Sequence, residues 1–302
     1  MKKNYTYVLI AFIFLASVFL RLDNLLWETY GYGEMEIKEV VDSYLKGNFV
    51  NNYYLFDTPP LGKYLFTLSA ILFGSTEFGL RIVSVIFGIL TVIAMLFFTK
   101  KLYDTKLAIL AASLTGFSII HLQFSRYAQV ETILSFLYIA IIYFLWSMTE
   151  NNGKYDFLLL GASLGLALSV KFTSVIMLVI AVAYLLYTRH IKLSIKPNFS
   201  ISIQNNVLKA LAVAFVMFMI LWPFGLQRLH TEANITVDYG DVSRSQTVAA
   251  DVPIMVMSFF RRIFSSVGEA VPHSLAMGTP VINYVLLYLT KEFMLIIPMI
   301  IA

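Results

Sequence analysis

The stretch Tyr53–Leu65, YYLFDTPPLGKYL, interrupts a strongly hydrophobic chain. Its Pro-Pro pair bends the backbone, because proline cannot continue a helix from within, and the Gly-Lys after it opens a new helix. A short acid-bearing segment, GEMEIKEVVDSYLKGNF, comes before it (residues 33–49). One apolar run precedes this pair of segments and another follows. The pattern predicts a polar segment held against a membrane surface between two spans.

The composition places the whole chain in a membrane. The 302 residues are 59% hydrophobic and 13% charged, with a mean hydropathy of +0.78, whereas soluble domains carry about 25% charged residues. Repeated long apolar runs predict an all-α integral membrane protein, a multi-span helical bundle. Cysteine is absent, which excludes disulfides and thiolate metal sites. The net charge of +4 is small, and no nucleic-acid partner is expected.

The apolar runs give the expected order of spans. We place them at Tyr7–Leu22, Phe78–Thr99, Leu107–His121, Val130–Met148, Phe157–Val170, Phe172–Tyr187, Val207–Trp222 and Val281–Ile301. The short run Thr67–Phe73 is expected to be a juxtamembrane or re-entrant helix. No small-residue cleavage site follows the first run, so it is expected to be a retained signal-anchor. The last run ends the sequence, which is what a truncated or split chain would show.

Charged residues separate between the two sides that these spans create. Basic residues fall in loops of one side, which the positive-inside rule makes cytoplasmic, together with the N-terminus. They are Lys2, Lys3, Lys100, Lys101, Lys106, Lys154, Arg189, Lys192 and Lys196. Acidic residues gather in the segments 23–77 and 223–280, which are therefore expected outside.

The expected organisation has three parts. Residues 1–222 form a transmembrane module with seven spans, whose first outer loop, 23–77, carries the site. Residues 223–280 form an outer segment that lies against the membrane, and residues 281–302 form the last span. Within the first outer loop, apolar residues recur at helical spacing from Ile37 to Leu45, which predicts a short interfacial helix. Gly31 and Gly33 are expected to let the backbone before it turn sharply.

Charged side chains from separate hairpins collect on the outer face. They are Glu34, Glu36, Asp57 and Lys63 from the first loop, Arg126 and Glu131 between the third and fourth spans, and Lys171 between the fifth and sixth. Charges near hydrocarbon are costly and tend to be functional. Cations would suit a phosphate-bearing lipid, and a carboxylate could accept a proton from an attacking hydroxyl.

Each of these residues also has a purely structural explanation. Glu34 and Glu36 could be the solvated start of a helix, and Asp57 could cap a turn. Arg126, Lys171 and Lys63 could extend to lipid headgroups. Glu131 could favour a helix N-terminus or pair with Arg126. Both sets of explanations stay open at the level of the residues.

In order along the chain, several motifs resemble those of the C-type membrane glycosyltransferases, and within them the protein O-mannosyltransferase and aminoarabinose transferase relatives. The segment beginning GEMEIKEVVD is similar to the first-loop motif in which an Asp-Glu pair precedes a helix. FDTPPLGKYL is similar to a His-Pro-Pro-Leu-Gly-Lys motif. Three further stretches resemble later segments of the family, namely RIVSVIFGILTV, SRYAQVETILSF and GLALSVKFTS. A fourth stretch, LLYLTKEFMLII, resembles a later span of the family more weakly.

This resemblance implies an inverting transferase that moves a hexose or pentose from a polyprenyl-phosphate carrier to a protein, lipid or glycan on the outer membrane face. It implies membrane lipids as surroundings and no nucleotide sugar. The sequence departs from the family at the catalytic Asp, which is Gly33 here, and at the His, which is Thr58. We therefore expect Glu34 or Glu36 to act as base. We expect Arg126 and Lys171 to hold the lipid phosphate, with Asp57, Glu131 and Lys63 nearby.

Two other functions remain open on the sequence. A transporter would place the same charges along a pathway, although the span interiors carry almost no ionisable groups. A non-catalytic relative of the family would explain Gly33. No cofactor is certain, and the outer carboxylates could hold a divalent cation. The sugar and the acceptor are not specified.

Overall fold

The computed structural model describes residues 3–26, 30–48, 59–150, 153–194, 200–222, 233–238 and 243–248. Its helices are α1 (Lys3–Leu22), α2 (Tyr32–Leu45), α4 (Leu61–Phe73), α5 (Glu77–Leu102), α6 (Thr105–Phe117), α7 (Ile119–Arg126), α8 (Glu131–Glu150), α9 (Asp156–Val170), the 3₁₀ turn η1 (Phe172–Ser174), α10 (Val175–Tyr187) and α11 (Asn205–Leu221). Its strands form two hairpins, β1 (Ile191–Ser194) with β2 (Ser200–Ile203) and β3 (Ala233–Asp238) with β4 (Ser243–Val248).

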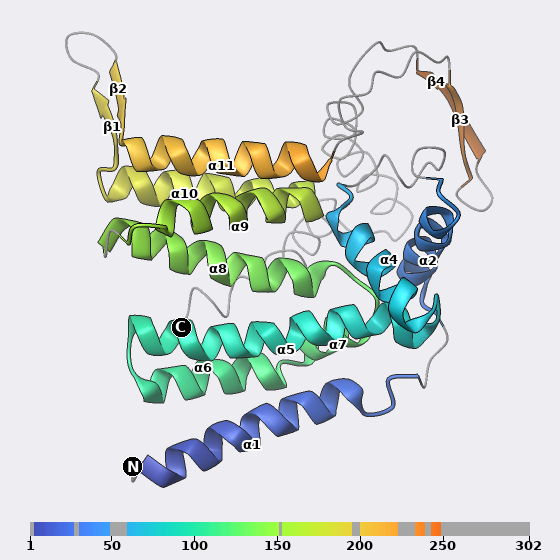
Figure 1. Ribbon diagram of the computed structural model, residues 1–302, viewed down its shortest axis with the longest axis horizontal. Coiled ribbons are helices and arrows are strands. Elements are labelled where there is room, and N and C mark those ends of the chain that lie inside the picture. Colours follow the sequence, from blue (N-terminus) through green and yellow to red (C-terminus); the bar gives the residue numbers. More distant parts are fainter. Residues whose placement is uncertain are drawn as a thin grey trace, which may run out of the picture.

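The long helices stack side by side with their axes roughly aligned (Figure 1). The helices α2 and α4 gather at one end of the stack, beside the ends of α1 and α7 and the starts of α5 and α8. The N-terminus and the β1–β2 hairpin lie at the opposite end. The helix α2, which carries Glu34 and Glu36, and the β1–β2 hairpin therefore occupy opposite ends of the stack.

The helices coincide with the predicted spans that lie within the described ranges. Three are long and apolar enough to cross a membrane, namely Tyr5–Leu22 of α1, α5 and α8. The predicted span Leu107–His121 is a bent pair, since α6 and α7 meet at 55°. The helices α4, α9 and α11 and the stretch Phe172–Tyr187 are apolar but shorter than 18 residues. The predicted span Val281–Ile301 lies outside the described residues.

Local sequence fixes where the helices begin and where the bent pair breaks. The hydroxyl of Thr76 caps α5 by accepting the N–H of Gly79, and the Asp104 carboxylate caps α6 by accepting the N–H of Leu107. Ser118 separates α6 from α7 and caps α7, where its hydroxyl accepts the N–H of His121. Such caps satisfy N–H groups that a helix start leaves without partners.

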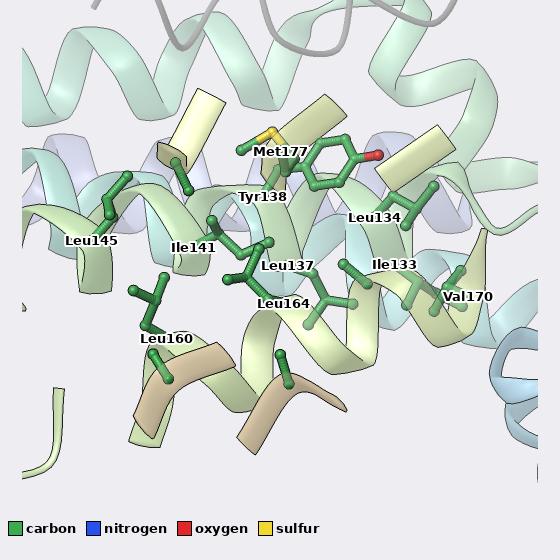
Figure 2. Packing of buried hydrophobic residues seen from close by; sticks show 14 of the residues in the cluster. Ile133, Leu134, Leu137, Tyr138, Ile141, Leu145, Leu160, Leu164, Val170 and Met177 are labelled. Atoms are coloured by element: carbon green, nitrogen blue, oxygen red, sulfur yellow. The ribbon is translucent and has the colours of Figure 1, made fainter. Parts of the chain in front are cut away.

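The core is built around α8. Its buried side chains form nearly unbroken runs over residues 132–135 and 137–141, so this part of the helix is buried on almost all sides. They pack against α9 and α10 through the cluster in Figure 2, where Leu137 and Ile141 of α8 lie beside Leu164 of α9. Because lipid is as apolar as this core, close packing rather than the hydrophobic effect stabilises such contacts inside a membrane.

The all-α prediction is confirmed for the bundle, and the two hairpins lie in the connections outside it. The register of β1–β2 pairs Ile191 with Ile203, and that of β3–β4 pairs Ala233 with Val248. Of the predicted outer segment 223–280, the structure describes only β3 and β4. Of the two glycines expected to let the backbone turn, Gly31 is the N-cap of α2 with a φ of −71°, whereas Gly33 lies inside α2 and so makes no turn.

Candidate active site

The segment Tyr127–Glu131, which joins α7 to α8, lies at the centre of the candidate site. Its Ala128 N–H donates to Glu34 of α2. Gln129 exchanges two hydrogen bonds with Ser84 of α5, one through its N–H and one through its carbonyl. Five consecutive residues therefore connect α2, α5, α7 and α8 at one end of the bundle. The sequence predicts charges at this turn but not its role as a meeting point.

Glu34 and Arg81 form a buried ion pair. Arg81 Nε donates to Glu34 Oε1 and Arg81 Nη2 donates to Oε2, each at 2.8 Å. The two residues are 0% and 1% exposed. A guanidinium matches a carboxylate in this two-bond geometry, which makes the pair specific in orientation as well as strong. Arg81 also donates to the Leu25 carbonyl at 2.7 Å, and its guanidinium lies 5.5 Å from the centre of the Tyr127 ring.

Every lone-pair direction of the Glu34 carboxylate is occupied by a donor. Besides Arg81, Oε1 accepts the Ala128 N–H at 2.7 Å and Oε2 accepts the Gly31 N–H at 3.0 Å. Burial alone would raise the pKa of Glu34, but the hydrogen bonds from Arg81, Ala128 and Gly31 outweigh burial and hold the pKa below its ordinary value. A carboxylate in this state accepts a proton poorly, because protonation would disrupt donors already in place.

The Lys171 side chain contacts the other end of the segment Tyr127–Glu131. Lys171 Nζ lies 3.2 Å from Glu131 Oε1, so Glu131 pairs with Lys171 and not with Arg126, the alternative partner expected from the sequence. A Cβ atom at Gly62 would lie 2.6 Å from Val130 and 3.9 Å from Val170.

This close approach at Gly62 brings the start of α4 against the residues that precede Glu131 and Lys171 along the chain. Lys63 follows Gly62 in the first turn of α4, so that turn lies near the residues before Glu131 and Lys171, and Lys63 is 9% exposed. Two cations and a carboxylate from three separate elements thus share one region. Sequence reasoning names all three residues but gives no indication that Gly62 brings them together.

The remaining predicted residues are placed less centrally. Arg126 ends α7 and donates to the Asn24 carbonyl at 3.1 Å, which ties it to the turn after α1. Glu36 is half-buried in the first half of α2, two positions beyond Glu34, so the two side chains project from different sides of that helix. Asp57 lies outside the described residues.

Sequence reasoning missed Arg81 and Gln129 as site residues. Arg81 begins the apolar run of α5, and an arginine at the start of a span is the signal that could have identified it. Gln129 faces the position where the resembled family has its catalytic Asp, since a Cβ at Gly33 would lie 3.3 Å from Gln129 Nε2. No sequence pattern indicates this contact, because it joins residues 96 positions apart through the fold.

A divalent cation is not supported by a ready-made ligand set in the part of the chain that the structure describes. Within those ranges, no three His, Asp or Glu side chains gather in a way that could hold a metal ion. The two outer carboxylates described above are each paired with a cation, Glu34 with Arg81 and Glu131 with Lys171.

Comparisons with known proteins identify the family. The sequence model of the dolichyl-phosphate-mannose-protein mannosyltransferases matches residues 57–222, just over half of the chain. Two crystal structures of ArnT from Cupriavidus metallidurans, one in the apo state and one bound to undecaprenyl phosphate, share the fold at a TM-score of 0.53 and 16% sequence identity. The similarity covers 72% and 73% of this chain and 40% of each ArnT chain.

The chain therefore spans less than half the length of the ArnT chains that it matches. No match is found among curated protein sequences. The match to residues 57–222 includes α4 to α11, and so includes Lys63, Arg81, the Tyr127–Glu131 segment and Lys171. This integral membrane protein belongs to the dolichyl-phosphate-mannose-protein mannosyltransferase family.

Proposed function

We propose that the chain carries the donor site of a glycosyltransferase, which moves a sugar from a polyprenyl-phosphate carrier to a protein, lipid or glycan on the non-cytoplasmic membrane face. The description of the matching family names a lipid-phosphate-linked mannose and a protein acceptor. An ArnT structure of the same fold binds undecaprenyl phosphate. Both findings support a phosphorylated isoprenoid as the donor for this chain.

One observation carries the proposal beyond the family. The first turn of α4, which carries Lys63, packs against Val130 and Val170, next to the Lys171–Glu131 pair, and the Tyr127–Glu131 segment also binds Glu34 of the buried Glu34–Arg81 pair. Two ammonium groups in a partly dehydrated region suit a phosphate, whose negative charge they would neutralise as it leaves. In this assignment Lys63 and Lys171 hold the donor phosphate, and Glu131 orients Lys171.

The carboxylates of α2 divide between two roles. Glu34 accepts four hydrogen bonds and has a lowered pKa, so it holds Arg81 and the Tyr127–Glu131 segment in place. Glu36, half-buried on the same helix, is the group that we assign as base. In an inverting displacement the acceptor oxygen bonds to the anomeric carbon while that carbon's bond to the phosphate oxygen breaks. The acceptor proton passes to Glu36, and the polyprenyl phosphate departs.

The isoprenoid tail would reach this region from the bilayer along α4. That helix buries Gly62, Lys63 and Phe66 on one side and exposes a continuous apolar side. The exposed side consists of Leu68, Ile71, Leu72 and Phe73. This apolar side lies in the C-terminal half of α4, opposite the side that buries Lys63, and it would offer the isoprenoid tail a surface along the helix.

The test is transfer of labelled sugar from a panel of polyprenyl-phosphate sugars by the full-length chain in liposomes. Glu36→Gln is expected to lower turnover by about 100-fold or more, as loss of a general base does. The control is Glu39→Gln, which changes an exposed carboxylate on the same helix and is expected to leave turnover unchanged. Full activity in Glu36→Gln would remove the base assignment.

The phosphate site is tested by donor binding. Lys63→Ala and Lys171→Ala are each expected to weaken binding of polyprenyl phosphate, while Arg126→Ala, which removes a bond to the Asn24 carbonyl, is expected to weaken it less. Unchanged affinity in both lysine variants would contradict the assignment. Gly33 favours a second candidate, a non-catalytic relative that binds the lipid. Donor binding without turnover on any donor would support that second function.

A further inference from the structure

A second buried polar cluster lies away from the candidate site, between α1, α6 and α7. We call it the Arg21 cluster; it comprises Ser17, Arg21, Gly116 and His121. Arg21 is 0% exposed. Its Nη1 donates to the Ser17 carbonyl at 2.9 Å, the Ser17 hydroxyl at 2.6 Å and the Gly116 carbonyl at 3.2 Å. Its Nη2 lies 2.8 Å from His121 Nδ1.

The cluster holds a charge without a carboxylate. Among the residues that the structure describes, no Asp or Glu lies within ion-pair distance of Arg21. An arginine buried near the end of a membrane span is costly, and such residues are usually kept for a purpose. Here the nearest compensating charge is the C-terminus of α6, whose last carbonyls have no helical partner and carry the negative end of the helix dipole.

The bond to His121 fixes the form of that side chain. Arginine can only donate hydrogen bonds, so His121 accepts at Nδ1 and carries its proton on Nε2. Because His121 lies in α7 and Gly116 in α6, Arg21 contacts both sides of the 55° break at Ser118. The Arg21 cluster therefore holds α1 against both α6 and α7, at the point where these two helices bend.

The chain just after Arg21 connects this cluster to the candidate site. Asn24 has a φ of 48°, a left-handed conformation that asparagine tolerates better than most residues. In the turn that follows α1, the carbonyls of Asn24 and Leu25 accept hydrogen bonds from Arg126 and Arg81. Arg81 in turn holds Glu34. The position of Arg81 thus depends on a turn that begins within four residues of Arg21.

We propose that Arg21 and His121 are positioning residues, which hold the end of α1 against the α6–α7 break and thereby set where Arg81 and Glu34 lie. Neither residue touches the proposed substrate. The Arg21 cluster itself stands on its own contacts, and its effect on turnover rests on the proposed function.

The absence of cysteine allows spin labels to be placed cleanly. Labels at Leu26→Cys, an exposed residue of the turn after α1, and Lys101→Cys, exposed at the far end of α5, report whether the turn is held. Since Arg81 and Lys101 are separated by about 30 Å along α5, the pair suits pulsed electron paramagnetic resonance. A single narrow distance distribution is expected for the otherwise wild-type chain.

Arg21→Met and His121→Leu are expected to broaden this distribution. His121→Asn, which restores an acceptor, is expected to keep it narrow. Arg189→Met serves as control, because Arg189 is exposed after α10. If the distance distribution is unchanged in Arg21→Met, the proposed role of Arg21 is overturned. If it is unchanged in His121→Leu, the proposed role of His121 is overturned. If Arg21→Met does not fold, the two His121 variants still decide the outcome.

Turnover gives the second readout. In Arg21→Met, kcat is expected to fall by about 10- to 100-fold with an unchanged donor KM, as for a misplaced reacting group. His121→Asn is expected to recover most of that loss relative to His121→Leu. A broadened distance with wild-type kcat would overturn the link to the site. If the wild-type chain transfers no sugar, the proposed function fails, and the spin-label arm still decides the Arg21 cluster.

Discussion

Removing either partner of the Glu34–Arg81 pair is expected to destabilise the protein strongly. Glu34→Gln leaves one oxygen as acceptor and places an NH₂ group against two of the four present donors, so at least two hydrogen bonds are lost. A hydrogen bond to a charged group contributes about 1.5–3 kcal/mol, and loss of one partner from a buried pair costs about 3–5 kcal/mol. Because both side chains are fully buried, we expect a loss of about 4 kcal/mol for each single variant.

A double-mutant cycle with Arg81→Met checks this reasoning. The double variant Glu34→Gln/Arg81→Met removes the unpaired charge, so its cost is expected to lie well below the sum of the single costs, with a coupling of about 2 kcal/mol or more. The assay is equilibrium unfolding in mixed micelles. Lys38→Met serves as control, since the Lys38–Asp42 pair is 30% and 36% exposed and is expected to contribute less than about 1 kcal/mol. Additive single effects would refute the account of a coupled buried pair.

Three further perturbations have defined outcomes. Because the pKa of Glu34 is lowered in the folded state, this group stabilises the fold at pH values above the ordinary carboxyl pKa of about 4.3, and the stabilisation is lost as pH falls through the folded-state pKa. The free energy of unfolding measured below pH 5 should therefore depend on pH less steeply in Glu34→Gln than in the wild-type chain. Gly62→Ala would place a methyl 2.6 Å from Val130 and should lower the free energy of unfolding by about 1–3 kcal/mol, as measured by thermal unfolding. The double variant Gly62→Ala/Val130→Ala should recover stability, whereas wild-type stability in Gly62→Ala would contradict this packing. Gly33→Asp, which needs only a small shift of Gln129, should fold and raise turnover; reduced turnover in a folded protein would argue against an acid at that position.

The sequence determines the helices well, because each rests on local properties. Apolar runs predict α1, α5 and α8, and Ser118 shows in hindsight why Leu107–His121 is not one straight span. The helix α2, which carries Glu34, and the end of α9, which Lys171 follows, lie at the same end of the stack (Figure 1). The hairpins were not expected, since β1 and β2 are only four residues each and carry little periodic signal.

The pairing of site residues could not be predicted, since it depends on contacts between distant segments. Glu34 and Arg81 are 47 residues apart in the chain, and Glu131 and Lys171 are 40 apart. No local feature of the sequence distinguishes Glu34, whose carboxylate is fully occupied by an ion pair and hydrogen bonds, from Glu36, which is half-buried two positions later. The close approach of Gly62 to Val130 is likewise a property of helix packing and not of the motif around the two prolines.

The convergence of α4 on the Tyr127–Glu131 segment is the central claim, and disulfide formation tests it most directly. In the chain without cysteine, Gly62→Cys and Val130→Cys would place their Cβ atoms 3.7 Å apart, within the usual range for a disulfide. Mild oxidation of the membrane-embedded protein should cross-link this pair rapidly, while Leu68→Cys, on the exposed side of α4, should stay unlinked to Val130→Cys. A reduced Gly62–Val130 pair, or cross-linking of the Leu68 control in its place, would contradict the site described here.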